Sequence, residues 1–241
     1  TAPGGFAREG QLLNAMDASF ITPQAEPDYA DGAPLAAWRQ KVHVLGFPTL
    51  LPRESFHTEH DDIQCVFCGS LYPELREPGF ALALFSALNA PDVTLTMAGG
   101  GWERFTEAAD TAAATLSKRL VRPGLLPPEE AAALENRADV LVSLGNAYDN
   151  QMPSKLFGYF ATGKPILHLA TCDTDPTLPY LARYPLALVL YAKDGVTSGV
   201  TARLNRWLHE VRGRQLPFAE TAQLYPEFTP EKVAEEFLRW I

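Results

Sequence analysis

The feature that most constrains the fold of this chain is a series of short, continuously apolar segments that begins at about residue 63. A strand with one face in water alternates polar and apolar residues, whereas a strand covered by helices on both faces is apolar throughout. Between the apolar segments lie stretches with the apolar spacing of helices, such as "GFALALFSAL", "PSKLFGYFATG" and "VTSGVTARLNRWLHEVR". The pattern predicts a doubly wound, Rossmann-like α/β domain around a parallel sheet whose strands include "IQCVFCG", "DVTLTMA", "DVLVSLG", "KPILHLA" and "LALVLYA".

The two ends of the chain have a different organisation. Residues 1 to about 55 predict a helix and a short strand in "REGQLLNAMDASFITP", then a second strand in "KVHVLGFPTLLPRES". Two strands are too few for a domain, so we interpret this part as the tail of a preceding α/β domain. The last segment, "TPEKVAEEFLRWI", predicts an amphipathic helix with Thr229 as N-cap and Pro230 at its first position. Because the sequence begins with neither an initiator methionine nor a signal peptide, we expect it to be part of a longer protein.

Charge and cysteine content argue against some classes of function. The net charge of −9 over 241 residues disfavours non-specific nucleic-acid binding, which requires clustered lysines and arginines. The three cysteines do not make a disulfide framework, and reduced thiols indicate a cytoplasmic protein. Cys65 and Cys68 form a CxxC inside a predicted strand without a second pair of ligands, so core positions are favoured over a metal or redox site. No apolar run approaches the ~20 residues of a membrane span.

Candidate binding residues follow the predicted strands, at the edge of the sheet where open α/β folds bind their ligands. Arg76 comes after "IQCVFCG", and a triple glycine at 99–101 comes after "DVTLTMA". Ser154 and Lys155 begin the helix that follows "DVLVSLG". A helix N-terminus and two basic side chains are the elements of a diphosphate site. Each feature alone is more often structural, and their order along one sheet edge is what indicates an anion site.

Two further motifs favour a structural interpretation. His168 lies in a predicted strand, and a buried, hydrogen-bonded histidine is favoured there over a residue that lines a cleft. The tripeptide "DTD" at 173–175 could coordinate a cation, but we interpret it as a polar loop.

Several segments together resemble the C-terminal half of a GT-B glycosyltransferase, the type built from two Rossmann-like domains. They are "FCGSLYPELREPGFALALFSAL", "LTMAGGG", "VRPGLLPPEEAAALENRADVLVSLGN" and above all "NQMPSKLFGYFATGKPIL", and they span about residues 63 to 170. The resemblance assigns residues 1–55 to a remnant of the N-terminal acceptor domain with its linker. It assigns 56–225 to the domain that binds a nucleotide-sugar donor, and 226–241 to a helix that crosses back to the N-terminal domain.

The resemblance also implies a function and a set of roles. The activity would be a hexosyl-type transfer from a UDP- or GDP-sugar to a saccharide or lipid-linked acceptor, as in polysaccharide synthesis, with retention of configuration. No cofactor and no metal are expected, no catalytic residue is assigned, and peripheral association with the inner face of the membrane would come through the missing N-terminal half. The donor diphosphate would contact Gly69, Ser70, Arg76, Pro153, Ser154 and Lys155. The base and ribose would contact Pro123, Gly124, Leu125 and Gly158. The sugar would contact Asn146, Asn150 and Gln151.

One position departs from the family pattern. Where this chain has Gly158, the resemblance would place a glutamate that accepts hydrogen bonds from the ribose hydroxyls. A glycine inside a helix also costs about 1 kcal/mol relative to alanine. The departure is compatible with weakened donor binding, with room for a bulkier ligand group, or with a protein that no longer transfers sugar. A non-catalytic nucleotide-binding or interaction module and a sugar-nucleotide 2-epimerase therefore stay as alternatives. A dinucleotide oxidoreductase is disfavoured because "CGSLYPEL" is not G-x-G-x-x-G.

Overall fold

The chain forms two compact units in a computed structural model that describes residues 5–53, 61–148 and 152–240. One unit comprises residues 1–51 together with 225–241, and the other comprises residues 52–224. The assignment of the first unit to an acceptor domain stays a prediction. No helix among the described residues has both the length and the apolarity that crossing a bilayer requires.

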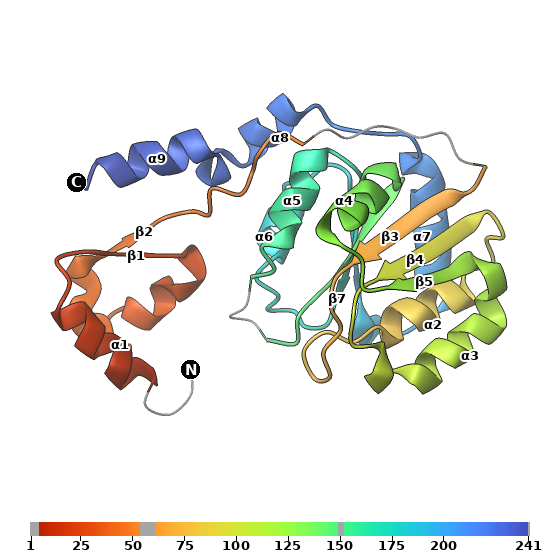
Figure 1. The fold of residues 1–241 in the computed structure, drawn as a ribbon, viewed down its shortest axis with the longest axis horizontal. Helices are drawn as coiled ribbons and strands as arrows, with labels where there is room; N and C mark the ends of the chain where they lie inside the picture. The colour runs from red at the N-terminus through yellow and green to blue at the C-terminus, as the bar shows by residue number, and fades with distance from the viewer. Residues whose placement is uncertain (1–4, 54–60, 149–151, 241) are drawn as a thin grey trace. The chain divides into compact units, whose positions relative to one another are not determined.

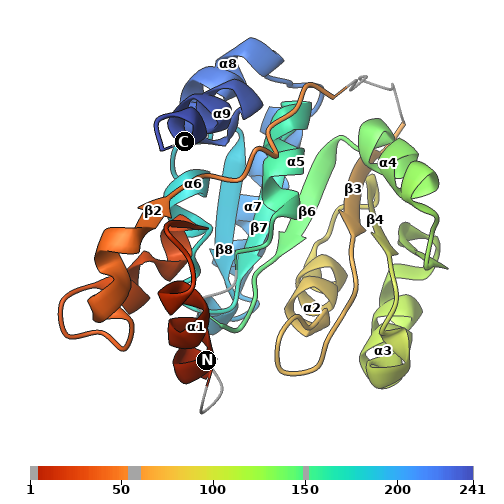
Figure 2. The same cartoon turned by 60° about the vertical axis from the view of Figure 1, so that its left-hand side comes forward.

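The larger unit is built on a six-stranded sheet in which every pair of neighbouring strands is parallel. The sheet order is β5-β4-β3-β6-β7-β8, and Figure 2 shows β6, β7 and β8 following one another away from β3. The predicted fold class is therefore confirmed. The strands are β3 (Ile63–Cys68), β4 (Val93–Ala98), β5 (Leu120–Gly124), β6 (Val140–Leu144), β7 (Ile166–Ala170) and β8 (Ala187–Tyr191).

The burial of the strands explains why the apolar runs are continuous. Every residue of β6 and β7 is buried, and so are five of the six residues of β3 and of β4. The two edge strands differ: β8 alternates between buried and partly exposed residues, and β5 has no buried residue. Pro123 lies within β5, where an edge strand tolerates the missing backbone N–H.

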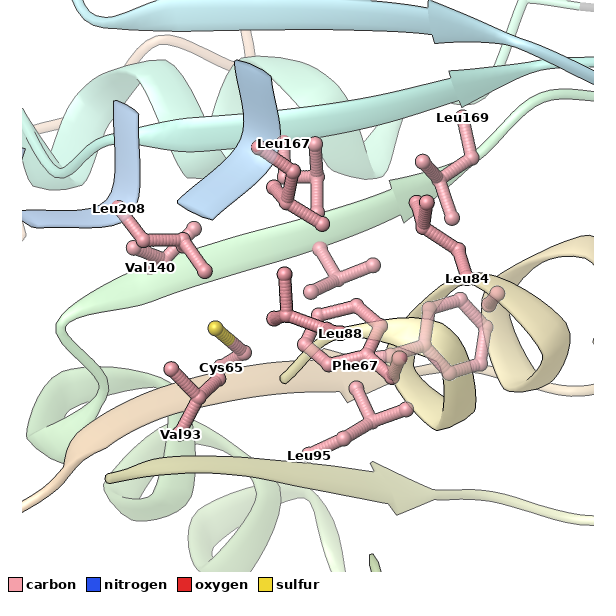
Figure 3. Packing of buried hydrophobic residues seen from close by; sticks show 14 of the residues in the cluster. Cys65, Phe67, Leu84, Leu88, Val93, Leu95, Val140, Leu167, Leu169 and Leu208 are labelled. Atoms are coloured by element: carbon pink, nitrogen blue, oxygen red, sulfur yellow. The ribbon is translucent and has the colours of Figure 1, made fainter. Parts of the chain in front are cut away.

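Helices cover both faces of this sheet. On one face the strands share a core with α2 (Gly79–Ala87), α3 (Thr106–Leu116) and α7 (Ser198–Val211). Figure 3 shows Phe67 of β3, Val140 of β6, Leu84 of α2 and Leu208 of α7 in this core. Cys68 follows Phe67 and so points to the other face, where its thiol lies 3.8 Å from the carbonyl oxygen of Ala131 in α4. In Figure 1, α4 (Pro128–Arg137) and α5 (Lys155–Thr162) lie in front of the sheet.

The order of the strands fixes where a ligand can bind. The chain runs from β3 outward to β4 and β5, then returns to β6 on the other side of β3 and continues to β7 and β8. This reversal between β3 and β6 is the topological switch point, where open α/β sheets bind ligands beyond the carboxyl ends of their strands. The loops after β3, β4 and β6 and the start of α5 converge there.

The smaller unit contains a two-stranded parallel sheet of β1 (Ser19–Ile21) and β2 (Val42–Val44), preceded by α1 (Gly5–Asn14). Its last element, α9 (Pro230–Leu238), starts as predicted, since the Thr229 side chain accepts a hydrogen bond from the backbone N–H of Lys232. The rings of Phe237 and Phe20 lie 4.9 Å apart, and Trp240 stacks on His43 at 3.6 Å between centroids. Aromatic contacts therefore hold the end of the chain to this unit.

Some elements are absent from the sequence prediction. The helix α3 has the sequence "TEAADTAAATL", in which alanines and threonines leave almost no periodic pattern of large apolar residues. The helices α6 and α8 are only four and seven residues long, too short for a periodic pattern. These elements are α6 (Leu178–Leu181), α8 (Phe218–Leu224) and the 3-10 helices Pro23–Tyr29, Ala36–Lys41, Trp102–Arg104, Ser117–Arg119, Ala192–Asp194 and Pro226–Phe228.

Candidate functional site

Two adjoining pockets lie at the switch point of the larger unit. The outer pocket has a volume of about 160 Å³ and the inner pocket about 50 Å³. Cys68, Gly69 and Lys155 line both of them. The outer pocket is otherwise lined by Ser70, Ala98, Gly99, Leu125, Leu126 and Ala131, and the inner pocket by Phe67, Arg76, Val142, Ser143, Leu144, Pro153, Leu156 and Tyr159.

Backbone of two loops forms the wall of the outer pocket. Gly99 has a φ of +140°, and a Cβ atom there would lie only 1.8 Å from the carbonyl oxygen of Gly69. Its N–H donates to the carbonyl oxygen of Gly124 at 2.8 Å. Only glycine allows the ends of β3, β4 and β5 to approach this closely. This is the physical reason for a glycine directly after β4.

Arg76 lies in the inner pocket and is held by another predicted site residue. Its Nε and Nη2 donate to Oδ1 of Asn146 at 3.1 and 2.8 Å, and Nη1 lies 3.5 Å from the carbonyl oxygen of Ser70. Burial lowers the pKa of the guanidinium from its ordinary value. Asn146 is buried, so the structure places it as a neighbour of Arg76 at the end of β6. The predicted contact of Asn146 with the sugar stays a prediction.

The first residues of α5 present a basic group to both pockets. Ser154 is the N-cap of α5, and its hydroxyl makes no capping bond to the described backbone of the first turn. Lys155 Nζ donates to the carbonyl oxygen of Cys68 at 2.7 Å and lies 2.7 Å from Oε1 of Glu135. The lysine side chain is 45% exposed, so its ammonium is anchored but can be reached by a ligand.

A buried carboxylate connects Lys155 with a second cation. Glu135 of α4 is only 3% exposed, and its Oε2 lies 3.3 Å from Nη2 of Arg53. We call Arg53, Glu135 and Lys155 the Glu135 cluster. Burial, followed by the charge of Glu135, raises the pKa of the Cys68 thiol to about 12, so this cysteine is a neutral core residue. The same two causes raise the pKa of Tyr159 well above its ordinary value.

Sequence reasoning missed Arg53 and Glu135. They are 82 residues apart, and Glu135 stands in "ALENRAD", which is typical of a solvent-exposed helix face. No local pattern marked either residue, because α4 carries Glu135 against β3 and Arg53 lies in the irregular segment before that strand.

Gly158 lies on the side of α5 that faces the Glu135 cluster. Among the described residues outside the backbone of its own helix, the heavy atom within 4 Å of a Cβ built there is Nη1 of Arg53, at 3.5 Å. The same Nη1 lies 3.5 Å from the Gly158 carbonyl oxygen. A distance of 3.5 Å is ordinary van der Waals contact, so no steric clash requires a glycine at this position.

The remaining predicted site residues are distributed as follows. Pro123 and Gly124 belong to β5, and Leu125, which is 80% exposed, lies at the mouth of the outer pocket. Pro153 lines the inner pocket. Asn150 and Gln151 lie outside the described residues.

The interpretations of His168 and of Cys65 and Cys68 as buried core residues are confirmed. His168 is fully buried and lies 3.0 Å from Oγ of Ser143 and 2.9 Å from Oδ2 of Asp175. Cys65 and Cys68 are free thiols buried in the core. The described part of the chain contains no group of three His, Cys, Asp or Glu side chains arranged to hold a metal ion.

Comparison with known proteins shows the fold. No family model matches the sequence, and no curated protein is significantly similar to it. Alr3699/HepE from Anabaena, in complex with UDP-glucose, has a TM-score of 0.64 at 12% identity, covering 99% of this chain and 68% of that one. Sucrose-phosphate synthase from Thermosynechococcus elongatus has a TM-score of 0.61 at 15% identity, and the match covers 97% of this chain and 60% of that one. AviGT4, a glycosyltransferase involved in avilamycin A biosynthesis, has a TM-score of 0.53 at 14% identity, and the match covers 74% of this chain and 50% of that one.

These similar structures share the GT-B glycosyltransferase fold, so the predicted resemblance in fold is confirmed. The chain spans about half the length of AviGT4 and about two thirds of HepE.

Proposed function

We propose that this chain is the nucleotide-sugar-binding part of a glycosyltransferase. The observation that carries the proposal is the convergence of Lys155, Arg76 and the N-terminus of α5 on two adjoining pockets at the switch point of the sheet. A diphosphate needs several hydrogen-bond donors and about two positive charges, and this edge of the sheet supplies both. The GT-B fold adds support, because proteins of this fold have been crystallised with UDP and UDP-glucose.

In this proposal the donor lies along the sheet edge with its diphosphate between Lys155 and Arg76. Ser70 lines the outer pocket and Ser154 is the N-cap of α5, so their hydroxyl groups would donate to phosphate oxygens. The base lies towards the exposed Leu125, which offers an apolar surface next to the backbone of β5. We propose a UDP-sugar as the donor and a saccharide or lipid-linked saccharide as the acceptor, with retention of configuration.

The experiment is calorimetric titration of the chain with UDP, GDP and ADP. We expect one nucleotide, UDP, to bind with a dissociation constant between micromolar and sub-millimolar. Lys155→Ala should weaken binding by about tenfold or more, because a charge-assisted hydrogen bond contributes ~1.5–3 kcal/mol.

Lys118→Ala is the matched control, since Lys118 is an exposed lysine in the 3-10 helix that precedes β5, at the opposite edge of the sheet. Equal binding by wild type and Lys155→Ala, or no binding of any of the three nucleotides, would contradict the proposal. If UDP binds, a test for turnover of UDP-glucose would distinguish a transferase from a module that only binds nucleotide.

A further inference from the structure

The wall of the inner pocket includes Ser143 of β6, a residue with a hydroxyl group. Val142 and Leu144 belong to the core that the sheet shares with α2 and α7, so the Ser143 side chain between them points to the opposite face. Leu156 and Tyr159 of α5 line the same pocket from that face. The Ser143 hydroxyl is therefore directed to the side of the sheet from which α5 lines the inner pocket.

A buried network fixes the direction of the Ser143 proton. Despite burial, hydrogen bonds from His168 and Thr177 hold the pKa of Asp175 below its ordinary value, so Asp175 is ionised. Its Oδ2 lies 2.9 Å from His168 Nε2, and Oγ1 of Thr177, which already donates to Asp175, lies 3.3 Å from the same nitrogen. Because both neighbours of Nε2 are acceptors, the single proton of the neutral ring lies on Nε2. Nδ1 is then an acceptor, and the Ser143 hydroxyl at 3.0 Å donates to it.

A hydroxyl that donates to a histidine offers only lone pairs to a ligand. Arg76 and Lys155 line the same pocket and supply N–H donors with positive charge. A ligand group that satisfies both sides must accept from the cations and donate one proton to Ser143. A hydroxyl group does this, including the P–OH of hydrogen phosphate, whereas the oxygens of sulfate carry no proton and would face the Ser143 lone pairs. The volume of about 50 Å³ suits one such group.

We propose that the inner pocket is a subsite for a hydroxyl-bearing group, and that Ser143 selects this group by accepting its proton. The inference rests on the proposed function for the anion that Lys155 and Arg76 hold beside the subsite. The hydroxyl can come from free hydrogen phosphate or from the sugar of the donor, which present the same chemistry to Ser143. His168 and Asp175 act only through Ser143, so they are positioning residues for the subsite.

The test compares the binding of inorganic phosphate and sulfate by calorimetry at about pH 8, above the ordinary pKa of a histidine side chain. The two anions have nearly the same charge at this pH, but only phosphate keeps a proton. Wild type should bind phosphate about tenfold or more tightly than sulfate. Ser143→Ala should bring the two dissociation constants within about threefold. Ser86→Ala is the control, since it removes a hydroxyl from the groove between α2 and α3 and should keep the wild-type ratio.

Asp175→Asn tests the positioning role without changing a residue that lines the pocket. Thr177 donates to Oδ1 through its N–H and its hydroxyl, so the amide oxygen takes that place and the amide N–H₂ faces His168 Nε2. The ring proton then moves to Nδ1 and is donated to Ser143, whose own proton turns to the pocket. The preference for phosphate should fall to within about threefold or reverse. Asp173→Asn, at an exposed ion pair two residues away, should keep the wild-type ratio.

UDP-glucose and UDP identify the source of the hydroxyl. If the sugar of the donor supplies it, Ser143→Ala should weaken UDP-glucose by about fivefold or more and leave UDP unchanged. If free hydrogen phosphate supplies it, neither nucleotide should respond, while the ratio of phosphate to sulfate binding is lost. Both results support the subsite.

Other outcomes separate this inference from the function on which it rests. Equal binding of phosphate and sulfate by wild type, or an unchanged ratio in Ser143→Ala, would overturn the subsite, even if UDP binding depends on Lys155 and the proposed function stands. A preference for phosphate without any binding of UDP would support the subsite and contradict the function. If no anion binds, both are wrong. If Ser143→Ala does not fold, the wild-type ratio and Asp175→Asn still decide the question.

Discussion

Glu135 and Asp175 are two carboxylates with the same 3% exposure, yet their surroundings differ. Glu135 pairs with Lys155 and Arg53, whose side chains are both partly exposed, and Lys155 lines both pockets. Asp175 pairs with His168, which is fully buried. The burial of a carboxylate alone therefore does not distinguish a binding site from a structural network, whereas the exposure of its partners does.

Both carboxylate oxygens of Asp175 have hydrogen-bond partners on buried neighbouring residues. Oδ1 accepts hydrogen bonds from the backbone N–H and the hydroxyl of Thr177 at 2.8 and 2.6 Å, and Oδ2 lies 2.9 Å from His168 Nε2. His168 Nδ1 reaches Ser143 on β6. Burial by itself would raise the pKa of Asp175, but hydrogen bonds from His168 and Thr177, together with the charge of His168, hold it below its ordinary value. This network joins the loop after β7 to the neighbouring strand.

The largest effect is expected from Asp175→Ala. It removes the partner of a buried histidine and of the Thr177 N–H, and breaking a buried pair typically costs about 3–5 kcal/mol. Urea unfolding should show this loss as a lower midpoint with an unchanged slope. Asp173→Ala is the matched control two residues away: its ion pair with Lys193 is exposed on both sides, so the midpoint should hardly move.

The pH dependence provides a second check on Asp175. A carboxyl whose pKa is lowered by folding stabilises the folded state above its unfolded pKa, and this contribution is lost as pH falls. The difference in free energy of unfolding between wild type and Asp175→Ala should therefore narrow below pH 3.8, the ordinary pKa of the group. A difference that stays constant through this range would contradict the assignment of an ionised Asp175.

A smaller loss is expected from Gly99→Ala on the wall of the outer pocket. The added Cβ would overlap the carbonyl oxygen of Gly69 at 1.8 Å, and φ is +140°. Backbone strain and overpacking together should cost about 2–4 kcal/mol. At Gly100 a Cβ meets nothing within 4 Å, so Gly100→Ala should change stability by less than about 0.5 kcal/mol. Equal effects of the two substitutions would show that the loops after β3 and β4 do not need their close approach.

Part of the fold and part of the candidate site could be predicted from the sequence. The strands were recognisable because helices on both faces of a parallel sheet require continuous apolar runs. The placement of Arg76 and Lys155 at one edge followed from the rule that parallel strands end on the same side. The helix α3 was not recognisable, because its alanines and threonines pack against α2 without a strong apolar periodicity.

The Glu135 cluster could not be predicted because no local pattern joins its members. Arg53 comes from the segment before β3, Glu135 from the end of α4 and Lys155 from the start of α5. Only the packing of α4 and α5 on the same face of the sheet brings these three charges together. The pairing of Arg76 with Asn146 is similar, since these residues follow different strands and meet at the switch point.

A still smaller loss is expected from Glu135→Gln. The substitution keeps the shape of the side chain but removes the charge between Arg53 and Lys155, at a cost of about 1–3 kcal/mol. The cost is below that of Asp175→Ala because both cations can be solvated. Glu129→Gln, at an exposed position of the same helix, is the control.

Binding of inorganic pyrophosphate provides a second readout for Glu135→Gln. The variant has one negative charge fewer beside Lys155, so it should bind pyrophosphate more tightly than wild type. A loss of stability as large as that of Asp175→Ala, with no change in pyrophosphate binding, would contradict a role of Glu135 in the binding site. Glu135 would then be a structural residue, like Asp175 in its buried hydrogen-bond network.

The smallest effect, and the only gain, is expected from Gly158→Ala. Alanine is favoured over glycine inside a helix by about 0.5–1 kcal/mol, and the new Cβ would make ordinary contact with Arg53 at 3.5 Å. The urea midpoint should therefore rise, as it should by a comparable or smaller amount for Gly199→Ala in α7. A fall in the midpoint at position 158, but not at 199, would mean that the guanidinium of Arg53 needs the space above the α5 backbone. Gly158 would then be a fourth member of the Glu135 cluster, because its missing side chain leaves space for the guanidinium of Arg53. The lower helix propensity of glycine would be the energetic cost of that arrangement.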